Sequence, residues 1–443
     1  MTKSDKITAI FEEFKKLHPI SIDLSLDRIQ ILLDRLGRPQ DRLPPTIHVA
    51  GTNGKGSTIA FLKAMLIGNG KSVHTYTSPH LVHFNERIHL ANSKSKTLPI
   101  DDNLLAEILQ HVIRINNKEP ITFFEMTTAA AFMAFSEIQA DFLLLEVGLG
   151  GRFDATNVIS KPRCSIITPV SIDHSDKLGS TLELIAFEKA GILKPGIPAV
   201  IGPQDPASMT SIKQTSQRVG SPLYCYGQNY LVFEEHSRLI FQSEQRLIDL
   251  PLPVLIGRNQ IFNAGVAIAT TLLLTDGYIN TEALEYGLTK AKWPARFMRL
   301  RGEPFASWIE HETEIWLDGG HNPGASSAIA QTLADLQDRT FKPIYLITGL
   351  LNNKDAQNFF KPFLGLVKEI HTVPIPNSTM AMDTKLLANH AKSAGLTTFT
   401  ANDVRSAITS IEESQDGPKR ILVCGSLHLA GSILAESDTD FFA

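Results

Sequence analysis

The 443-residue chain contains only three cysteines, and Cys164, Cys225 and Cys424 lie far apart. This spacing excludes a disulfide framework and a cysteine-based metal site, and it favours a reduced, intracellular setting. A net charge of −4 leaves no excess of basic residues for binding nucleic acid. The most apolar stretch, residues 129–135, is far shorter than a membrane span, and two glutamates stand where a signal peptide has its apolar segment. We therefore expect a cytoplasmic protein that binds neither nucleic acid nor membranes.

Short apolar runs are frequent instead, and they alternate with helical patterns along most of the chain. Runs without polar alternation predict buried parallel strands at residues 47–51, 72–77, 142–148, 164–170 and 197–202. From about residue 314 the alternation restarts, with predicted strands at 314–320, 342–350, 369–375 and 420–426. A chain of this length exceeds one hydrophobic core. We therefore predict an α/β protein with a mainly parallel sheet in residues 1–292 and a smaller Rossmann-like α/β domain in residues 293–443.

Residues 51–58, GTNGKGST, join a predicted strand to a predicted helix. Backbone N–H groups of a glycine turn at a helix N-terminus bind anions, and Lys55 adds a positive charge. The segment therefore indicates a phosphate-binding loop and an N-terminal P-loop ATPase domain. Gly56 stands where the general motif has a hydroxyl residue, so Ser57 is displaced by one position. The alternative is an ordinary glycine-rich turn with a solvated lysine.

Polar residues near the ends of two further predicted strands form a second candidate group. Glu146 ends an apolar strand, at the edge where open α/β sheets bind ligands, and a carboxylate there suits Mg²⁺ beside phosphate. His174 follows the next strand and is either a ligand in the same crevice or a structural histidine. Asp154 and Asn157 are either site residues or turn residues. Lys189 and the glutamate before it lie in an apolar helical turn, where a solvated charge pair is the simpler interpretation.

An ordered set of motifs spans nearly the whole chain: HVAGTNGKGST, YTSPHLVHFNERI, LLLEVGLGGRFDATN, IDHSDKLG, EKAGILKPG, LDGGHNPGA, TGLLNNKDA and VCGSLHLAG. The set resembles the folylpolyglutamate synthase and dihydrofolate synthase family, relatives of the Mur ligases, and most of all its bifunctional bacterial members. The resemblance implies a Mur ligase-like ATP-binding domain followed by a glutamate-ligase domain. It also implies ATP-dependent addition of L-glutamate to 7,8-dihydropteroate and to the glutamate tails of reduced folates such as tetrahydrofolate. In that family the acceptor carboxylate first becomes an acyl phosphate, and the products serve folate biosynthesis and one-carbon metabolism.

The resemblance further implies roles for individual residues. Those matching ATP-binding positions are Gly51, Asn53, Gly54, Lys55, Gly56, Ser57, Thr58, Asn263, Arg296 and Asp318. Those matching magnesium-site positions are Ser57, Ser78, Glu146 and His174. Lys189 matches a lysine that the family carries as a carbamate, and His321 matches a position beside the path of glutamate and phosphate. The catalytic set implied in this way is Lys55, Glu146, His174, Lys189 and His321.

The resemblance places a pterin site at Thr122, Phe123, Phe124, Glu125, Phe153, Asp154 and Ala155. An aromatic ring can stack on the pterin and a carboxylate can accept its N–H groups, although core packing is the alternative for Phe123 and Phe124. The implied cofactors are ATP and Mg²⁺ in two sites, and a monovalent cation requirement stays open. No pattern of a symmetric interface is visible, so we expect a monomer.

Three other functions remain in competition. A monofunctional folylpolyglutamate synthase would use the same motifs. A Mur-type cell-wall ligase usually carries a UDP-binding domain before the phosphate loop, but residues 1–46 have room only for a helix or two. A nucleotide-binding switch protein is suggested by NNKDA at residues 352–356, whose spacing differs by one from a guanine-specificity motif. Such a protein would not need glutamate.

Overall fold

The structure, a computed structural model, describes residues 7, 10–12, 14, 17, 25–92, 96–275, 277–310, 312–414, 416–437, 439 and 441. The chain forms two compact units. Unit 1 comprises Met1–Val170, Leu178–Pro253 and Ile261–Ala291, and unit 2 comprises Ser171–Lys177, Val254–Gln260 and Lys292–Ala443. The domains proposed from the sequence, residues 1–292 and 293–443, stay a prediction. Among the described helices, none is both long and apolar enough to cross a membrane.

Unit 1 is built on an eight-stranded sheet in the order β4-β3-β2-β5-β1-β6-β7-β8. Its strands are β1 (Thr46–Ala50), β2 (Val73–Tyr76), β3 (Ile88–Ala91), β4 (Thr97–Pro99), β5 (Phe142–Glu146), β6 (Cys164–Ile167), β7 (Ala199–Ile201) and β8 (Leu223–Cys225). The pairs β2–β3 and β3–β4 are antiparallel and the others parallel. β1 lies between β5 and β6, and Val49 pairs with Glu146. The carboxyl ends of the central strands therefore meet at one edge.

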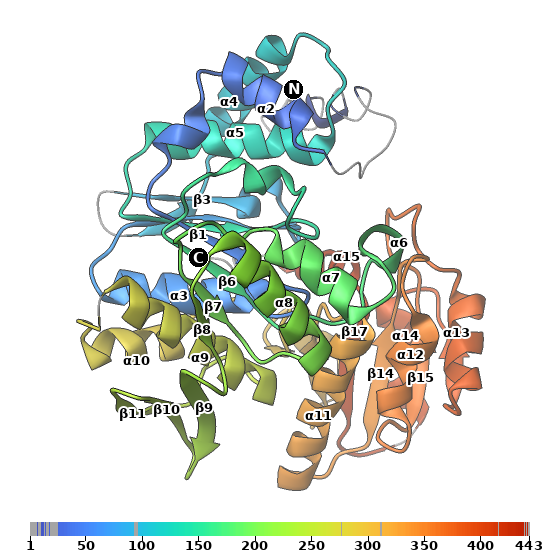
Figure 1. Cartoon of the computed structure of the whole chain (residues 1–443). Helices are drawn as coiled ribbons and strands as arrows, with labels where there is room; N and C mark the ends of the chain where they lie inside the picture. The colour runs from blue at the N-terminus through green and yellow to red at the C-terminus, as the bar shows by residue number, and fades with distance from the viewer. Residues whose placement is uncertain are drawn as a thin grey trace. The chain divides into compact units, whose positions relative to one another are not determined.

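Helices cover both faces of this sheet. They are α2 (Asp27–Arg35), α3 (Lys55–Gly68), α4 (Asp102–Asn116), α5 (Phe123–Glu137), α7 (Leu182–Ala190), α8 (Pro206–Val219), α9 (Arg258–Leu274) and α10 (Thr281–Lys290), with 3₁₀ turns η1 (Pro39–Arg42), η2 (Phe84–Arg87) and η3 (Ala155–Val158). Apolar side chains of α2, α4 and α5 share one core with Tyr76, Leu143 and Leu145 of the sheet. Helices α3 and α10 lie on the opposite side (Figure 1). Burial on both faces explains why β5 is apolar up to Glu146. In β1 the polar residues Thr46 and His48 are buried as well.

A second, antiparallel sheet in unit 1 was not predicted from the sequence. It consists of β9 (Tyr230–Glu235), β10 (Arg238–Ser243) and β11 (Leu247–Pro251), in the order β11-β10-β9. Val232, Leu239 and Phe241 are buried on one face, whereas Leu231 and Leu247 on the other are exposed. Apolar residues on both faces obscure the alternation that normally marks an antiparallel strand.

Unit 2 is a six-stranded sheet in the order β12-β13-β17-β14-β15-β16, in which only β12 and β13 are antiparallel. Its strands are β12 (Met298–Leu300), β13 (Glu314–Leu317), β14 (Ile344–Thr348), β15 (Glu369–Thr372), β16 (Thr398–Thr400) and β17 (Arg420–Cys424). Its helices are α11 (Pro323–Arg339), α12 (Ala356–Phe360), α13 (Thr384–Ser393), α14 (Val404–Ser414) and α15 (Leu427–Leu434), with η4 (Phe305–Trp308) and η5 (Lys361–Phe363). The short helix α6 (Ser175–Leu178) begins in this unit. The predicted α/β fold with two mainly parallel sheets is confirmed.

Candidate active site

The glycine loop of residues 51–54 leaves β1 and leads directly into α3. Gly51 and Gly54 have φ angles of +148° and +86°, which disfavour any residue with a side chain. A Cβ at Gly51 would overlap the Thr168 hydroxyl, and a Cβ at Gly54 would overlap the Asn263 amide oxygen. Both glycines are therefore required by conformation and by space. The loop also brings the predicted residue Asn263 of α9 next to the start of α3.

The N-terminus of α3 is open toward the loop. Its N-cap is Gly54, and no side chain caps the helix. The first-turn N–H groups that lack helical partners can therefore bind an anion, and the helix dipole favours negative charge there. Gly56, Ser57 and Thr58 lie in this turn and are buried. The predicted phosphate-binding segment thus has the strand, turn and helix that such a site needs.

Lys55 and Glu146 meet at the carboxyl edge of the sheet. The Lys55 Nζ donates hydrogen bonds to the Gly51 carbonyl (3.1 Å) and the Thr52 carbonyl (3.3 Å), and lies 4.0 Å from the Glu146 carboxylate. The second Glu146 oxygen accepts a hydrogen bond from the Ser78 backbone N–H at 3.1 Å. Both carboxylate oxygens of this buried side chain therefore face predicted site residues, and Glu146 stands at the end of β5 as expected.

Lys189 lies beside the same loop and is not a solvated residue. Its Nζ is buried in the last turn of α7 and donates a 2.9 Å hydrogen bond to the Gly51 carbonyl. The preceding residue, Glu188, forms an ion pair with Arg152 at 2.8 Å instead. The solvated charge pair considered for residues 188 and 189 is therefore wrong. Two lysine ammonium groups, Lys55 and Lys189, converge on one carbonyl oxygen.

In unit 2, Asp173 and four polar residues around its carboxylate come together from three chain segments. Lys354 Nζ donates a 2.7 Å hydrogen bond to one carboxylate oxygen, and Asn322 Nδ2 donates a 3.0 Å bond to the other. His321 Nε2 lies 3.7 Å from Asp173, and His174 Nε2 lies 3.9 Å from it. Burial alone would raise the pKa of Asp173, but the nearby His321 and the charge of Lys354 lower it far below its ordinary value. We call these five residues the Asp173 cluster.

The sequence reasoning found only part of the Asp173 cluster. It selected His174 and His321 but gave no role to Lys354 or Asn322, which lie 181 and 149 positions from Asp173. Both residues stand in motifs that resemble the family, NNKDA and LDGGHN. The resemblance of these two motifs to the family was the sequence signal that could have identified Lys354 and Asn322.

Asp318 and Arg296, predicted to hold nucleotide, lie near each other in unit 2. The Asp318 carboxylate is buried and accepts backbone N–H groups of Phe297 (2.8 Å) and Gly320 (2.6 Å), so it joins the segment before β12 to the end of β13. Burial raises the pKa of Asp318, whereas the positive charge of Arg296 lowers it. The Arg296 side chain donates to the Ala295 carbonyl at 2.8 Å.

The predicted pterin residues have structural partners of their own. Thr122 and Glu125 form a capping box at the start of α5, and Glu125 also pairs with Arg28 at 3.1 Å. Asp154 is buried and caps η3 while accepting the Leu149 N–H at 2.8 Å. A threonine three residues before a glutamate is a sequence signature of this cap, which the pterin assignment overlooked. The Glu125 carboxylate contacts all involve Oε2, whereas its Oε1 is buried without a hydrogen-bond partner among the described residues, and the pterin assignments stay predictions.

The aromatic members of that set differ in exposure. Phe123 packs edge-on against Phe11 at 5.2 Å, and Phe124 packs near Tyr76 at 6.2 Å. Phe153 is 39% exposed, and the Arg152 guanidinium lies 4.3 Å from its ring. Phe153 is therefore the member whose ring is most available to a ligand, while its neighbour Ala155 is buried.

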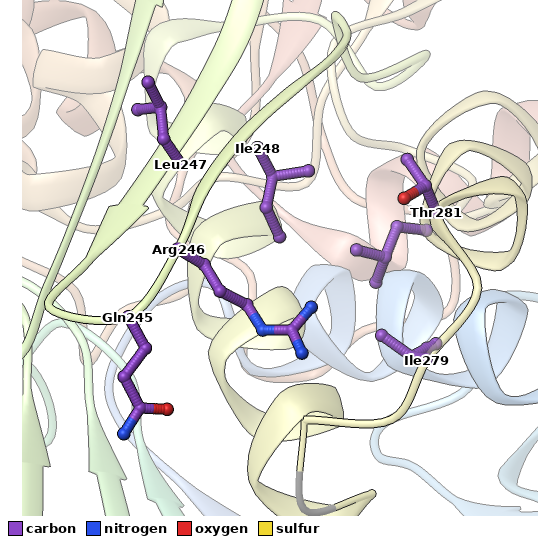
Figure 2. A pocket seen from close by; sticks show the side chains of 7 residues that line it. Gln245, Arg246, Leu247, Ile248, Ile279 and Thr281 are labelled. Carbon is purple, nitrogen blue, oxygen red and sulfur yellow. The ribbon is translucent and has the colours of Figure 1, made fainter.

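A pocket of about 500 Å³ lies elsewhere in unit 1. Arg246, in the turn before β11, and Ile248, in β11, face Ile279 and Thr281 across it (Figure 2). No predicted site residue lines this pocket.

Comparisons with known proteins identify the family of this chain. Residues 49–271 match the Mur ligase middle domain, and residues 303–436 match the C-terminal domain of dihydrofolate synthetase. The dihydrofolate synthase/folylpolyglutamate synthase of Bacillus subtilis (strain 168) is 33% identical over 425 residues, covering 92% of this chain and 94% of that protein. The chain belongs to the dihydrofolate synthase/folylpolyglutamate synthase family.

Solved structures of this family share the fold. E. coli FolC in complex with DHPP and ADP is 26% identical, with a TM-score of 0.85 and 97% of each chain covered. The bifunctional folylpolyglutamate synthase/dihydrofolate synthase of Yersinia pestis, complexed with AMPPNP and Mn ion, is 28% identical, with a TM-score of 0.84 and 97% of each chain covered. The predictions of family and fold are confirmed.

The residues at the glycine loop fit a nucleotide and a hard divalent cation. The uncapped α3 and Lys55 offer N–H groups and a cation to phosphate. Glu146 offers a carboxylate, and Ser57 and Ser78 offer hydroxyl oxygens. Among the residues that the structure describes, no group of three His, Cys, Asp or Glu side chains is placed to hold a metal. This donor set suits Mg²⁺, which prefers oxygen ligands and commonly shares them with phosphate and water.

Proposed function

We propose that the chain is an ATP-dependent ligase that adds L-glutamate to 7,8-dihydropteroate and to the glutamate tails of reduced folates. Family membership supports the reaction class. The geometric observation that carries the proposal is the uncapped α3 N-terminus with Lys55 placed 4.0 Å from Glu146. A carboxylate does not react with an amine unaided, and this group of residues supplies the charge needed to phosphorylate it.

The reaction has two steps. The acceptor carboxylate attacks the terminal phosphate of ATP, which gives an acyl phosphate and ADP. The glutamate amine then attacks the acyl carbon, and inorganic phosphate leaves as the amide forms. The α3 N–H groups and Lys55 hold and neutralise the phosphates, and Gly51, Asn53 and Gly54 shape the loop around them.

The remaining site residues are assigned on the family resemblance. Mg²⁺ in two sites would be held by Ser57, Ser78, Glu146 and His174, and it would offset phosphate charge when bound. Asn263, Arg296 and Asp318 would hold the nucleotide, and His321 would lie along the path of glutamate and phosphate. Phe153 would contact the pterin.

Carbamylation of Lys189 is supported by one feature of unit 1. Lys55 and Lys189 both donate to the Gly51 carbonyl, at 3.1 and 2.9 Å, so two ammonium groups lie close together. Like charges at this distance repel. Addition of CO₂ to the neutral Lys189 amine, with loss of a proton, would give a carbamate. This would replace the repulsion by attraction and add an anionic oxygen for a metal.

Paired assays of ADP release test the proposal. Dihydropteroate plus glutamate and tetrahydrofolate plus glutamate should each release ADP and form a new amide, and omission of glutamate should abolish amide formation. If ADP is released with tetrahydrofolate but not with dihydropteroate, the protein would be a monofunctional folylpolyglutamate synthase. Folded, nucleotide-bound protein that forms no amide with either acceptor would refute the ligase assignment.

A further inference from the structure

The loop of residues 77–87, which joins β2 to β3, is held by one buried carboxylate. Glu86 accepts backbone N–H groups from Leu81 (2.6 Å), Val82 (2.9 Å) and His83 (2.6 Å). Charged acceptors make the stronger hydrogen bonds, and three of them on one side chain fix the loop backbone. The loop also contains Ser78, whose backbone N–H contacts Glu146. The loop is therefore a rigid part of the candidate active site.

Arg87 ends this loop, and two of its side-chain contacts set the direction of its guanidinium. Its Nε donates a 2.8 Å hydrogen bond to His80 Nδ1, and its Cζ lies 5.3 Å from the centre of the Phe84 ring. Its backbone carbonyl accepts the Thr77 N–H at 2.9 Å, which ties Arg87 to the residue before Ser78. None of these contacts involves the two terminal Nη nitrogens of the guanidinium.

The Arg87 charge has no ion-pair partner of its own. Among the described residues, no carboxylate lies within ion-pair distance, and neither Nη atom donates a hydrogen bond to protein. Burial lowers the pKa of this guanidinium, while Tyr76 and Glu146 raise it. Arginine stays protonated at neutral pH. A partly buried charge whose N–H donors have no protein acceptor costs free energy unless an anion binds to it. The presence of such a charge in a fixed loop points to an anionic ligand.

The aromatic side chains around Arg87 favour a carboxylate ligand over a nucleotide phosphate. Phe84, which contacts the guanidinium, packs against Phe11 at 4.6 Å and Phe123 at 6.2 Å, so Arg87 lies at the edge of an aromatic group. A flat acceptor that ends in a carboxylate matches this pairing of rings and cation. A nucleotide phosphate would match the cation but not the rings. The guanidinium fork also fits a carboxylate with two parallel hydrogen bonds.

Resting on the proposed function, we propose that the two Nη groups of Arg87 bind the carboxylate of the acceptor substrate and hold it for phosphorylation. His80 and Glu86 are positioning residues, because they fix the guanidinium and the loop without reaching the substrate.

The experiment compares Arg87→Gln, Arg87→Lys and a matched control, Arg218→Gln. Arg218 lies over the Phe187 ring at the same 5.3 Å but is exposed on α8. Steady-state kinetics give KM for dihydropteroate and for ATP, and thermal melting confirms folding. Losing a charged hydrogen bond should raise KM for the acceptor ~10- to 100-fold in Arg87→Gln. KM for ATP should change less than about 3-fold, Arg87→Lys should fall between, and the control should match wild type.

Calorimetric binding of dihydropteroate and its carboxamide provides the second arm. Wild type should prefer the carboxylate, and Arg87→Gln should lose that preference. An equal rise in KM for ATP would make the nucleotide the ligand of Arg87, and unchanged constants would make the residue structural; either result overturns the inference alone. If the wild-type protein binds and ligates neither dihydropteroate nor tetrahydrofolate, the proposed function fails together with this inference.

Discussion

Replacing Asp173 by Asn should destabilise unit 2 far more than its small change in shape suggests. The Asp173–Lys354 pair is short, at 2.7 Å, and buried, with side chains 10% and 6% exposed. At an effective dielectric constant of 20, the gross Coulomb attraction at this distance is ~6 kcal/mol. Most of it offsets the desolvation of both charges. Removing the carboxylate leaves the Lys354 ammonium buried next to His174 Nε2 at 3.4 Å but without its negative partner, which costs about 3–5 kcal/mol.

Asp335→Asn is the matched control. Its partner Arg258 makes an equally short contact of 2.7 Å in the same unit, but the two side chains are 66% and 24% exposed for arginine and aspartate. An exposed pair contributes under about 1 kcal/mol. Scanning calorimetry without metal or nucleotide should show the midpoint falling by roughly 6–20 °C for Asp173→Asn and by at most a few degrees for Asp335→Asn. Equal shifts in the two variants would refute the argument from burial.

Three further perturbations test other features. Lys189→Ala should abolish ADP release, with partial return on adding short-chain carboxylic acids; unchanged turnover would make the residue a packing lysine. Gly54→Ala, which forces a side chain against Asn263, should raise KM for ATP at least ~10-fold, and unchanged nucleotide affinity would contradict the loop assignment. Burial lowers the pKa of His48 and of His89 to about 3 from 6.5. As the pH falls, the unfolded chain binds these protons before the folded chain does. The free energy of unfolding should therefore be unaffected above pH 6.5 and decrease toward pH 3, by up to ~5 kcal/mol for each histidine. A His48→Gln variant whose free energy of unfolding depends on pH in the same way as wild type would contradict this.

The parts of the site that follow one strand were predictable from the sequence. An apolar run that ends in Glu146, and another that ends in the glycine loop, can be placed at the same sheet edge, because both are parallel strands of one sheet. Structure then confirmed the positions of β1, β5 and α3. Local periodicity is sufficient here, since each element is determined by residues adjacent in sequence.

Contacts between distant segments were not predictable in this way. Nothing near Asp173 in the sequence indicates that Lys354 pairs with it, because the contact depends on how β14 and its following loop fold within unit 2. Glu125 shows a different case. Its capping-box pattern was visible locally, and the structure gives the side chain Thr122 and Arg28 as partners. The ligand role that the family resemblance implies for Glu125 stays a prediction.

The donor set at the glycine loop also has a consequence for the order of binding. Glu146 is the carboxylate placed there, and no described cluster of three His, Cys, Asp or Glu groups can hold a cation by itself. Besides Glu146 and the proposed ligands His174 and carbamylated Lys189, a divalent ion would take ligands from serine hydroxyls, phosphate oxygens and water. The open N-terminus of α3, in turn, attracts phosphate without a metal. Metal affinity at this loop should therefore depend on bound nucleotide, so the charge needed to activate a carboxylate assembles only when ATP is in place.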